Sequence, residues 1–200
     1  MKDDARVGSA LVEQSHLASA VFVASVGAFA VGELRQAMRV RRGAARADVR
    51  AELLFRAMFF SGILFLPAAR AAVPGATLGG AWTFALGLTI GWLGLLLRWW
   101  SFVTLGKYFT VVLMTTGDQP VVDRGPYRVL RHPSYTALLL AVSGAGLMLG
   151  NWVGTVAAVT VVLTALCYRL RVEERALTAA LGERYRAFAA TRARLIPRVW

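Results

Sequence analysis

Long apolar segments separated by basic ones dominate the pattern of this chain. The apolar runs cover residues 17–34, 53–73, 78–97, 135–149 and 152–170. A helix of about 20 apolar residues is long enough to cross the ~30 Å hydrocarbon core of a bilayer. The pattern therefore predicts a transmembrane helix in each long run. Residues 135–149 are short for an independent span and fit better as one half of a helical hairpin with residues 152–170.

Two more polar stretches complete the predicted fold. Residues 101–133 contain several glycines and prolines and are expected to form a loop with short helical pieces. Residues 171–200 are charged, with apolar side chains at helical spacing, and predict an amphipathic C-terminal helix. We therefore expect an all-α integral membrane protein with five transmembrane helices, organised as a three-helix region (1–100) and a second region (101–200).

Composition and charge support a membrane protein over a soluble one. Apolar residues make up 57% of the chain and charged residues 17%, which leaves too little polar surface to cover a soluble globule. The net charge of +12 would suit nucleic acid, but the arginines and lysines lie mostly just outside the apolar runs. We therefore expect no nucleic-acid partner. With one cysteine, Cys167, neither an internal disulfide nor a Cys-rich metal site is expected.

The distribution of arginine and lysine predicts the orientation. Residues 35–56 hold seven, residues 98–131 five and residues 169–198 eight, against two in the N-terminal tail. By the positive-inside rule, the N-terminus lies outside and the three basic segments lie in the cytoplasm. A cleavable signal peptide is the alternative for the first run, but the acidic residues before it make a poor signal. Within that run Glu33 is the one charged residue.

Two short stretches carry most of the candidate chemistry. Residues 125–135 place Arg131, His132 and Tyr135 directly before a predicted membrane helix, and Pro133 disfavours helix at His132. An interfacial lipid anchor is the simplest interpretation of this stretch. Residues 169–175 place an arginine and a glutamate four residues apart, on one helix face. That stretch fits an ordinary helix end, although charges beside a membrane are often functional.

Taken together, residues 98–197 resemble the isoprenylcysteine carboxyl methyltransferase family and its phospholipid methyltransferase relatives, as a short member of bacterial or archaeal type. The matching motifs, in order, are Leu105-Gly106, Phe109-Thr110, residues 125–135, residues 169–174, Leu177, Gly182, Tyr185 and Leu195-Ile196-Pro197. One position departs from the family pattern, because Ala137 stands where the family usually has glycine. Its methyl group could crowd a backbone that approaches the cofactor closely.

The resemblance implies a methyltransferase that uses S-adenosyl-L-methionine. The cofactor would lie on the cytoplasmic side, between the 101–134 loop and the C-terminal helix, which suits a chain without a Gly-x-Gly-x-x-Gly sequence. Its expected binding residues are Tyr127, Arg131, His132, Pro133, Tyr135, Glu173 and Glu174. The expected catalytic residues are Arg169 and then Arg131, to position a substrate carboxylate, and Glu174 or His132 as a base should the substrate be an amine.

The acceptor is expected to be lipophilic and to reach the N-terminal region from the bilayer. An isoprenylcysteine-like carboxylate is the first choice, and phospholipid amine N-methylation is the alternative within the family. A membrane oxidoreductase related to sterol reductases is a further alternative, disfavoured because those chains are much longer. A non-catalytic, lipid-binding membrane protein is another. The expected setting is a bacterial or archaeal cytoplasmic membrane, with membrane lipids as partners and no metal.

Overall fold

The computed structural model describes residues 2–37, 45–46, 49–106, 114–115 and 121–197. Its helices are α1 (Lys2–Ala37), α2 (Val49–Ala72), α3 (Gly80–Leu105), α4 (Pro133–Leu149), α5 (Trp152–Leu181) and α6 (Glu183–Ala190), with a 3-10 helix, η2 (Gly125–Arg128). Two short antiparallel strands, β1 (Ala45–Arg46) and β2 (Met114–Thr115), pair with each other. Apart from this pair, the described elements are helical, as the hydrophobic pattern predicts.

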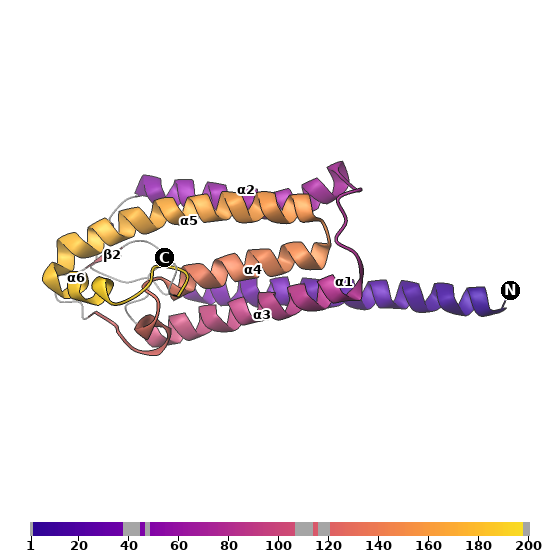
Figure 1. The fold of residues 1–200 in the computed structure, drawn as a ribbon, viewed down its shortest axis with the longest axis horizontal. Helices are drawn as coiled ribbons and strands as arrows, with labels where there is room; N and C mark the ends of the chain where they lie inside the picture. Colours follow the sequence, from indigo (N-terminus) through magenta and orange to yellow (C-terminus); the bar gives the residue numbers. More distant parts are fainter. Residues whose placement is uncertain (1, 38–44, 47–48, 107–113, 116–120, 198–200) are drawn as a thin grey trace.

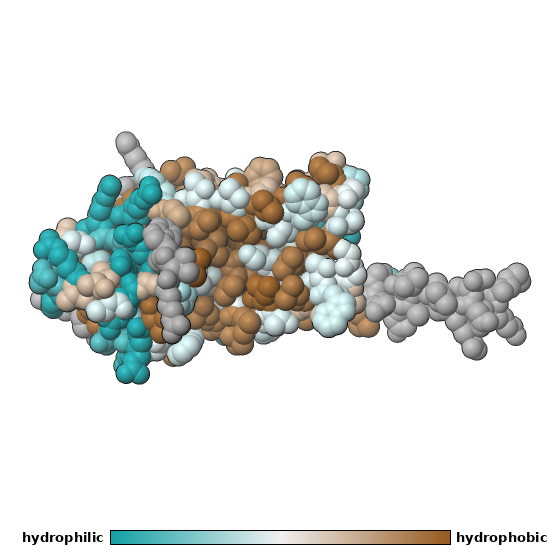
Figure 2. Space-filling view, viewed as in Figure 1, coloured by the Kyte–Doolittle hydropathy of each residue, from teal (hydrophilic) through white to brown (hydrophobic). Residues whose placement is uncertain are grey.

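Four helical segments are long and apolar enough to cross a membrane. They are His16–Arg35, Leu53–Ala72, Gly80–Leu105 and Trp152–Leu181. The apolar helix α4 is shorter, at 17 residues, so a fifth crossing is not confirmed. Figure 2 shows hydrophobic residues across the middle of the visible face of the bundle and hydrophilic residues gathered at one end. The chain is therefore a helical membrane protein.

The helices lie nearly parallel in two pairs with α1 at the side. Helix α3 packs along α4 and helix α2 packs along α5, while α4 and α5 join the two pairs (Figure 1). Helix α1 packs against α3, and its N-terminal part projects beyond the bundle (Figure 1). Helix α6 lies at the opposite end from the N-terminus. The residues that follow α6 turn back toward the start of α4, and this end contains the candidate site.

Close packing of α3 on α4 depends on glycine. A Cβ atom added at Gly94 would lie 2.7 Å from the carbonyl oxygen of Ala137, whereas a Cβ atom at Gly91 would meet nothing nearer than the Cα of Gly144, at 3.8 Å. Small residues at such positions let two membrane helices approach closely. Ala137 is fully buried in this contact.

Substitution of these two glycines is expected to have unequal effects. Gly94→Ala should lower the free energy of unfolding by about 1–3 kcal/mol, because its methyl group would press on backbone that cannot move independently of α4. Gly91→Ala is the matched control, because a methyl group there would make only an ordinary van der Waals contact with α4. Denaturation of the purified variants in detergent measures the difference. Equal stability of the two variants would contradict this packing.

The end of the chain differs from its predicted structure. Helix α5 continues past residue 170, where the apolar run ends, to Leu181. Gly182, with φ +54°, then separates it from α6, which ends at Ala190. The predicted C-terminal helix over residues 171–200 is therefore wrong, because the helical periodicity of residues 171–181 is continuous with that of the membrane helix. Helix α3 likewise extends eight residues beyond its predicted end. The motif residues Phe109 and Thr110 lie outside the described residues.

Candidate active site

A cavity of about 860 Å³ opens between the helices, a size typical of small-molecule sites. It has two parts. What we call the polar end is formed by Tyr127, Arg131, His132, Tyr135, Arg169, Glu173 and Tyr185. What we call the apolar channel continues from it between α1, α2, α3 and α4, and is lined mainly by aliphatic and aromatic side chains. Water-soluble and lipophilic groups could therefore occupy the same cavity.

The backbone before α4 is fixed by the segment that follows α6. The amide of Arg131 donates to the carbonyl of Ala193 at 2.8 Å, and the amide of His132 donates to that of Arg194 at 3.1 Å. The hydroxyl of Thr136 donates to the carbonyl of Leu195 at 2.7 Å, and the Leu195 side chain is 1% exposed. These bonds satisfy backbone groups that Pro133 excludes from regular helix, and they set the direction of the His132 side chain.

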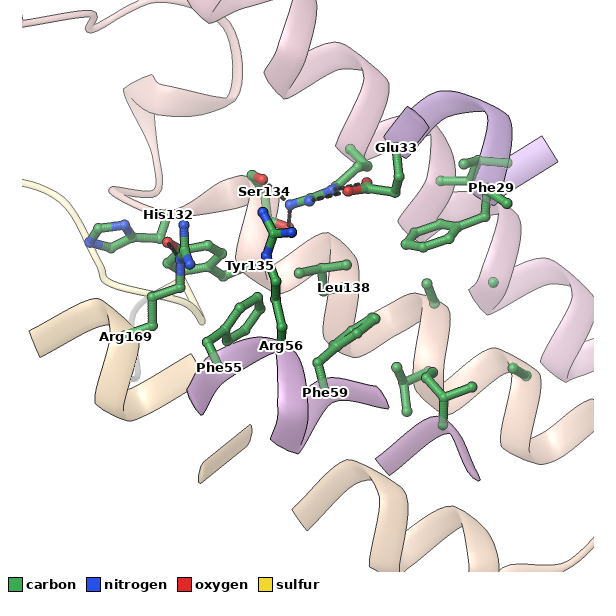
Figure 3. Close-up of a pocket in the computed structure, with 18 of the residues that line it drawn as sticks. Phe29, Glu33, Phe55, Arg56, Phe59, His132, Ser134, Tyr135, Leu138 and Arg169 are labelled. Carbon is green, nitrogen blue, oxygen red and sulfur yellow. Dashed lines mark hydrogen bonds and ion pairs between the residues drawn. The ribbon is translucent and has the colours of Figure 1, made fainter. Parts of the chain in front are cut away.

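A chain of polar contacts connects α4 with α5. Nε of Arg169 donates to the hydroxyl of Tyr135 at 2.8 Å, and that hydroxyl donates to the carboxylate of Glu173. The His132 ring stacks on the Tyr135 ring, with centroids 5.4 Å apart and planes 5° apart. Arg169 also lies over the ring of Phe55, 4.7 Å from its centroid. Arg169 thus stands where the polar end meets the apolar channel (Figure 3).

Glu174 contacts different residues from those that Glu173 contacts. Its carboxylate lies 2.9 Å from Nη1 of Arg131 and 3.2 Å from Nε of Arg194. It is not among the residues that line the cavity, although Nε2 of His132 lies 3.5 Å away. Two guanidinium groups therefore hold this carboxylate, and it ties the backbone before α4 to both α5 and the segment after α6.

Two buried polar atoms face the polar end without a hydrogen bond from the described residues. They are Nε2 of His132 and the hydroxyl of Tyr185, and each residue is 5% exposed. Burial, together with the negative charges of Glu174 and Glu173, raises the pKa of Tyr185 above its ordinary value. Its hydroxyl therefore stays protonated and able to donate. Nε2 of His132 still has the Glu174 carboxylate 3.5 Å away. Because buried polar groups are nearly always paired, the Tyr185 hydroxyl is the atom that points to a polar ligand at this end of the cavity.

A second charged layer lies where the apolar channel begins. Nε and Nη2 of Arg98 donate to the two carboxylate oxygens of Glu33, at 2.7 and 2.9 Å. Nη1 of Arg98 donates to the backbone carbonyl of Ser134 at 3.0 Å and to its hydroxyl. Figure 3 shows these bonds, with Arg56 reaching from α2 toward the same region. Arg98 thus fastens α1 to the first turn of α4.

The structure brings most of the residues singled out from the sequence to one cavity. Tyr127, Arg131, His132, Tyr135, Arg169 and Glu173 line it, whereas Pro133 and Glu174 do not. Ala137 is also absent from the lining, so its methyl group does not narrow the cavity. Glu33, Arg98 and Tyr185 line the cavity but were not predicted as site residues. A carboxylate in an apolar run is a signal that could have marked Glu33.

Comparison with known proteins agrees with this geometry. Residues 85–179 match the family model "Isoprenylcysteine carboxyl methyltransferase (ICMT) family". This segment, just under half of the chain, resembles the isoprenylcysteine carboxyl methyltransferase family. The match begins inside α3 and ends near the end of α5, and it includes both motif stretches of the polar end.

Individual relatives extend the comparison. The chain is 32% identical over 110 residues to protein-S-isoprenylcysteine O-methyltransferase B of Arabidopsis thaliana, covering 54% of this chain and 56% of the relative. It is 34% identical over 107 residues to the cobalt-zinc-cadmium resistance protein CzcN of Cupriavidus metallidurans, covering 52% and 46%. The chain therefore spans about half the length of these relatives.

A solved structure shares the fold. The eukaryotic intramembrane Ras methyltransferase ICMT superposes with a TM-score of 0.58 at 22% sequence identity. The match covers 72% of this chain and 52% of that one. It therefore extends beyond residues 85–179, into helices that the family model does not match.

Proposed function

We propose that the protein is an S-adenosylmethionine-dependent methyltransferase that acts in the membrane on a lipophilic acceptor, with an isoprenylcysteine-like carboxylate as the preferred group. The continuity of the cavity carries this proposal, because it joins a polar end to an apolar channel between membrane helices. A water-soluble methyl donor and a lipid-anchored acceptor could thus meet inside one cavity. The match of residues 85–179 to the family model supports the same chemistry.

The polar end has groups that fit the cofactor. S-adenosylmethionine supplies an electrophilic methyl group on a positively charged sulfur. The carboxylate of Glu173 and the stacked His132 and Tyr135 rings suit a cation, by charge and by cation–π attraction. The Tyr185 hydroxyl offers a buried hydrogen-bonding atom for a polar part of the molecule. Arg131 offers a charge complementary to a carboxylate.

Arg169 is the leading candidate to position the acceptor. It lies at the junction of the two parts of the cavity, where an acceptor whose chain fills the apolar channel would present its head group. An ionised carboxylate is already nucleophilic, so alignment by a guanidinium suffices and no base is needed. Arg131 remains the second candidate. Two guanidinium groups hold the Glu174 carboxylate. Glu174 is therefore better suited to position Arg131 than to act as a base.

We also propose the orientation predicted from charge. Helix α4, paired with α5, would make a fifth crossing, with the N-terminus outside and the polar end in the cytoplasm. In this arrangement residues 1–100 contribute most of the acceptor side and residues 101–200 most of the cofactor side. The gathering of hydrophilic residues at the α6 end of the bundle supports it (Figure 2).

Methyl transfer to a prenylated carboxylate tests the proposal directly. The purified full chain, given cofactor labelled in its methyl group and a farnesylcysteine derivative, is expected to form a product whose label is released by base, as a methyl ester requires. Base-stable label on phosphatidylethanolamine instead would indicate amine methylation. Arg186→Ala, on the exposed face of α6, is the control and should leave the rate unchanged. Binding of NADPH without binding of S-adenosylmethionine would overturn the proposal.

A further inference from the structure

One face of α4 lines the cavity along the whole helix. Its lining residues fall at helical spacing and are Tyr135, Leu138, Ala141, Val142, Ala145, Met148 and Leu149. From Tyr135 to Leu149 the helix rises about 21 Å, at 1.5 Å per residue. That length exceeds the ~15 Å depth of one bilayer leaflet, half of the hydrocarbon core. The apolar channel is therefore long enough to house a chain that reaches past the middle of the membrane.

The walls facing α4 are apolar below the Arg98 layer. Phe29 of α1, Phe59 and Ile63 of α2 and Leu88 of α3 belong to this part of the lining. Among the described lining residues at this depth, Ser25 has a polar side chain, and its hydroxyl donates to the Val21 carbonyl and accepts from Trp92. A hydrocarbon chain can therefore lie here without desolvating an unpaired polar group.

The far end of the channel lies at the last turn of α4. Met148 and Leu149 line it there, with Pro67 of α2. Among the described residues, none from the turns at 73–79 or 150–151 lines the cavity, so the lining stops short of these connections. The volume of about 860 Å³ is shared with the polar end, which favours one chain over the two of a diacyl lipid.

Two alanines on this face leave space at successive depths. Ala141 lies six residues beyond Tyr135, about 9 Å along the helix, and Ala145 lies ten residues beyond it, about 15 Å along. They are four residues apart, about 6 Å along the helix, which is comparable to the length of an isoprene unit. A larger side chain at either position would fill the channel at that depth and leave the space nearer Tyr135 open.

We propose that this face of α4 determines the length of the acceptor's chain, with Ala145 setting the longest chain accepted and Ala141 a shorter one. The occupant is a single long hydrocarbon chain whose head group stands at Arg169. The proposal rests on the methyltransferase function and specifies its substrate as a lipid with one extended chain.

Bulky substitutions at the two alanines test this assignment. Ala145→Phe should lower kcat/KM for a geranylgeranyl thioether carboxylate by about tenfold or more, while sparing the farnesyl and geranyl substrates. Ala141→Phe should lower kcat/KM for both geranylgeranyl and farnesyl substrates and spare geranyl. Ala85→Phe, on the exposed surface of α3 and outside the lining, is the matched control. A variant that merely folds poorly would lose all three substrates together, and Ala145→Leu then repeats the test with a smaller side chain.

A binding measurement separates this inference from the methyltransferase proposal. Laurate, palmitate and arachidate should raise the thermal stability of the wild-type protein increasingly with chain length, whether or not any acceptor is methylated. In Ala145→Phe, arachidate should raise the thermal stability no more than palmitate does. Palmitate should still raise it more than laurate does. Methylation failing with this pattern intact would reject the enzyme function and keep the channel. Two results would overturn the inference. One is a gain in thermal stability that does not depend on the length of the fatty acid. The other is a gain that is reduced equally for all three acids in Ala145→Phe and in Ala141→Phe.

Discussion

Replacing Arg98 by leucine is expected to lower the free energy of unfolding by about 3 kcal/mol or more. Arg98 is 7% exposed, and its guanidinium donates to both oxygens of Glu33 and to Ser134. Leucine would remove both hydrogen bonds that Arg98 donates to the Glu33 carboxylate, and the first turn of α4 would lose its contact with α1. Denaturation of the purified protein in detergent measures the change.

The same interaction predicts a recovery in the double variant. Glu33→Leu together with Arg98→Leu removes both charges, and it should be more stable than Arg98→Leu alone because no carboxylate deprived of its arginine hydrogen bonds remains. Arg171→Leu, an exposed arginine on α5, controls for the substitution itself. Strictly additive effects of the two single substitutions would show that Glu33 and Arg98 do not interact.

Glu173→Ala is expected to reduce methyl transfer by about 10²-fold or more, the cost of misplacing reacting groups. Glu173 accepts the hydrogen bond of Tyr135, which in turn accepts one from Arg169, so alanine would release both Tyr135 at the polar end and Arg169 at its junction with the apolar channel. Initial rates of methyl incorporation, at saturating and at limiting acceptor, measure the loss.

Two further variants show whether the loss comes from this network. Tyr135→Phe keeps the ring that stacks on His132 but removes the hydroxyl, so its rate should lie between those of the wild type and Glu173→Ala. Glu183→Ala removes a carboxylate that is 82% exposed on α6 and should leave the rate unchanged. Full activity in Glu173→Ala would exclude Glu173 from the site.

The long helices could be predicted because a membrane imposes a simple rule on sequence. Every described helix from α1 to α5 contains one of the predicted apolar runs. Their ends were less predictable. Arg98 looks like the basic end of a span, yet α3 continues past it, because a charge paired with Glu33 and Ser134 need not reach water. Helix α5 likewise continues past the end of its apolar run to Leu181, because the helical periodicity of residues 171–181 continues that of the membrane helix.

The candidate site was predictable to the extent that its residues lie in two compact motifs. His132, Tyr135, Arg169 and Glu173 stand close to one another in the structure, and the motifs that contain them suggested a shared site. Tyr185 gave no separate signal, because an aromatic residue at helical spacing usually belongs to a core. Its role became visible when the fold placed its hydroxyl, without a described partner, in the same cavity.

The pairing of residues 193–195 with the backbone before α4 has a consequence for biosynthesis. Helices α1 to α4 leave the ribosome first and can enter the membrane before this segment emerges. The backbone amide of His132, however, donates to the carbonyl of Arg194, so this hydrogen bond can form only when that segment is present. Insertion of the helices and completion of the polar end are therefore separate events, and a nascent chain still attached to the ribosome is already a membrane protein but has no finished site.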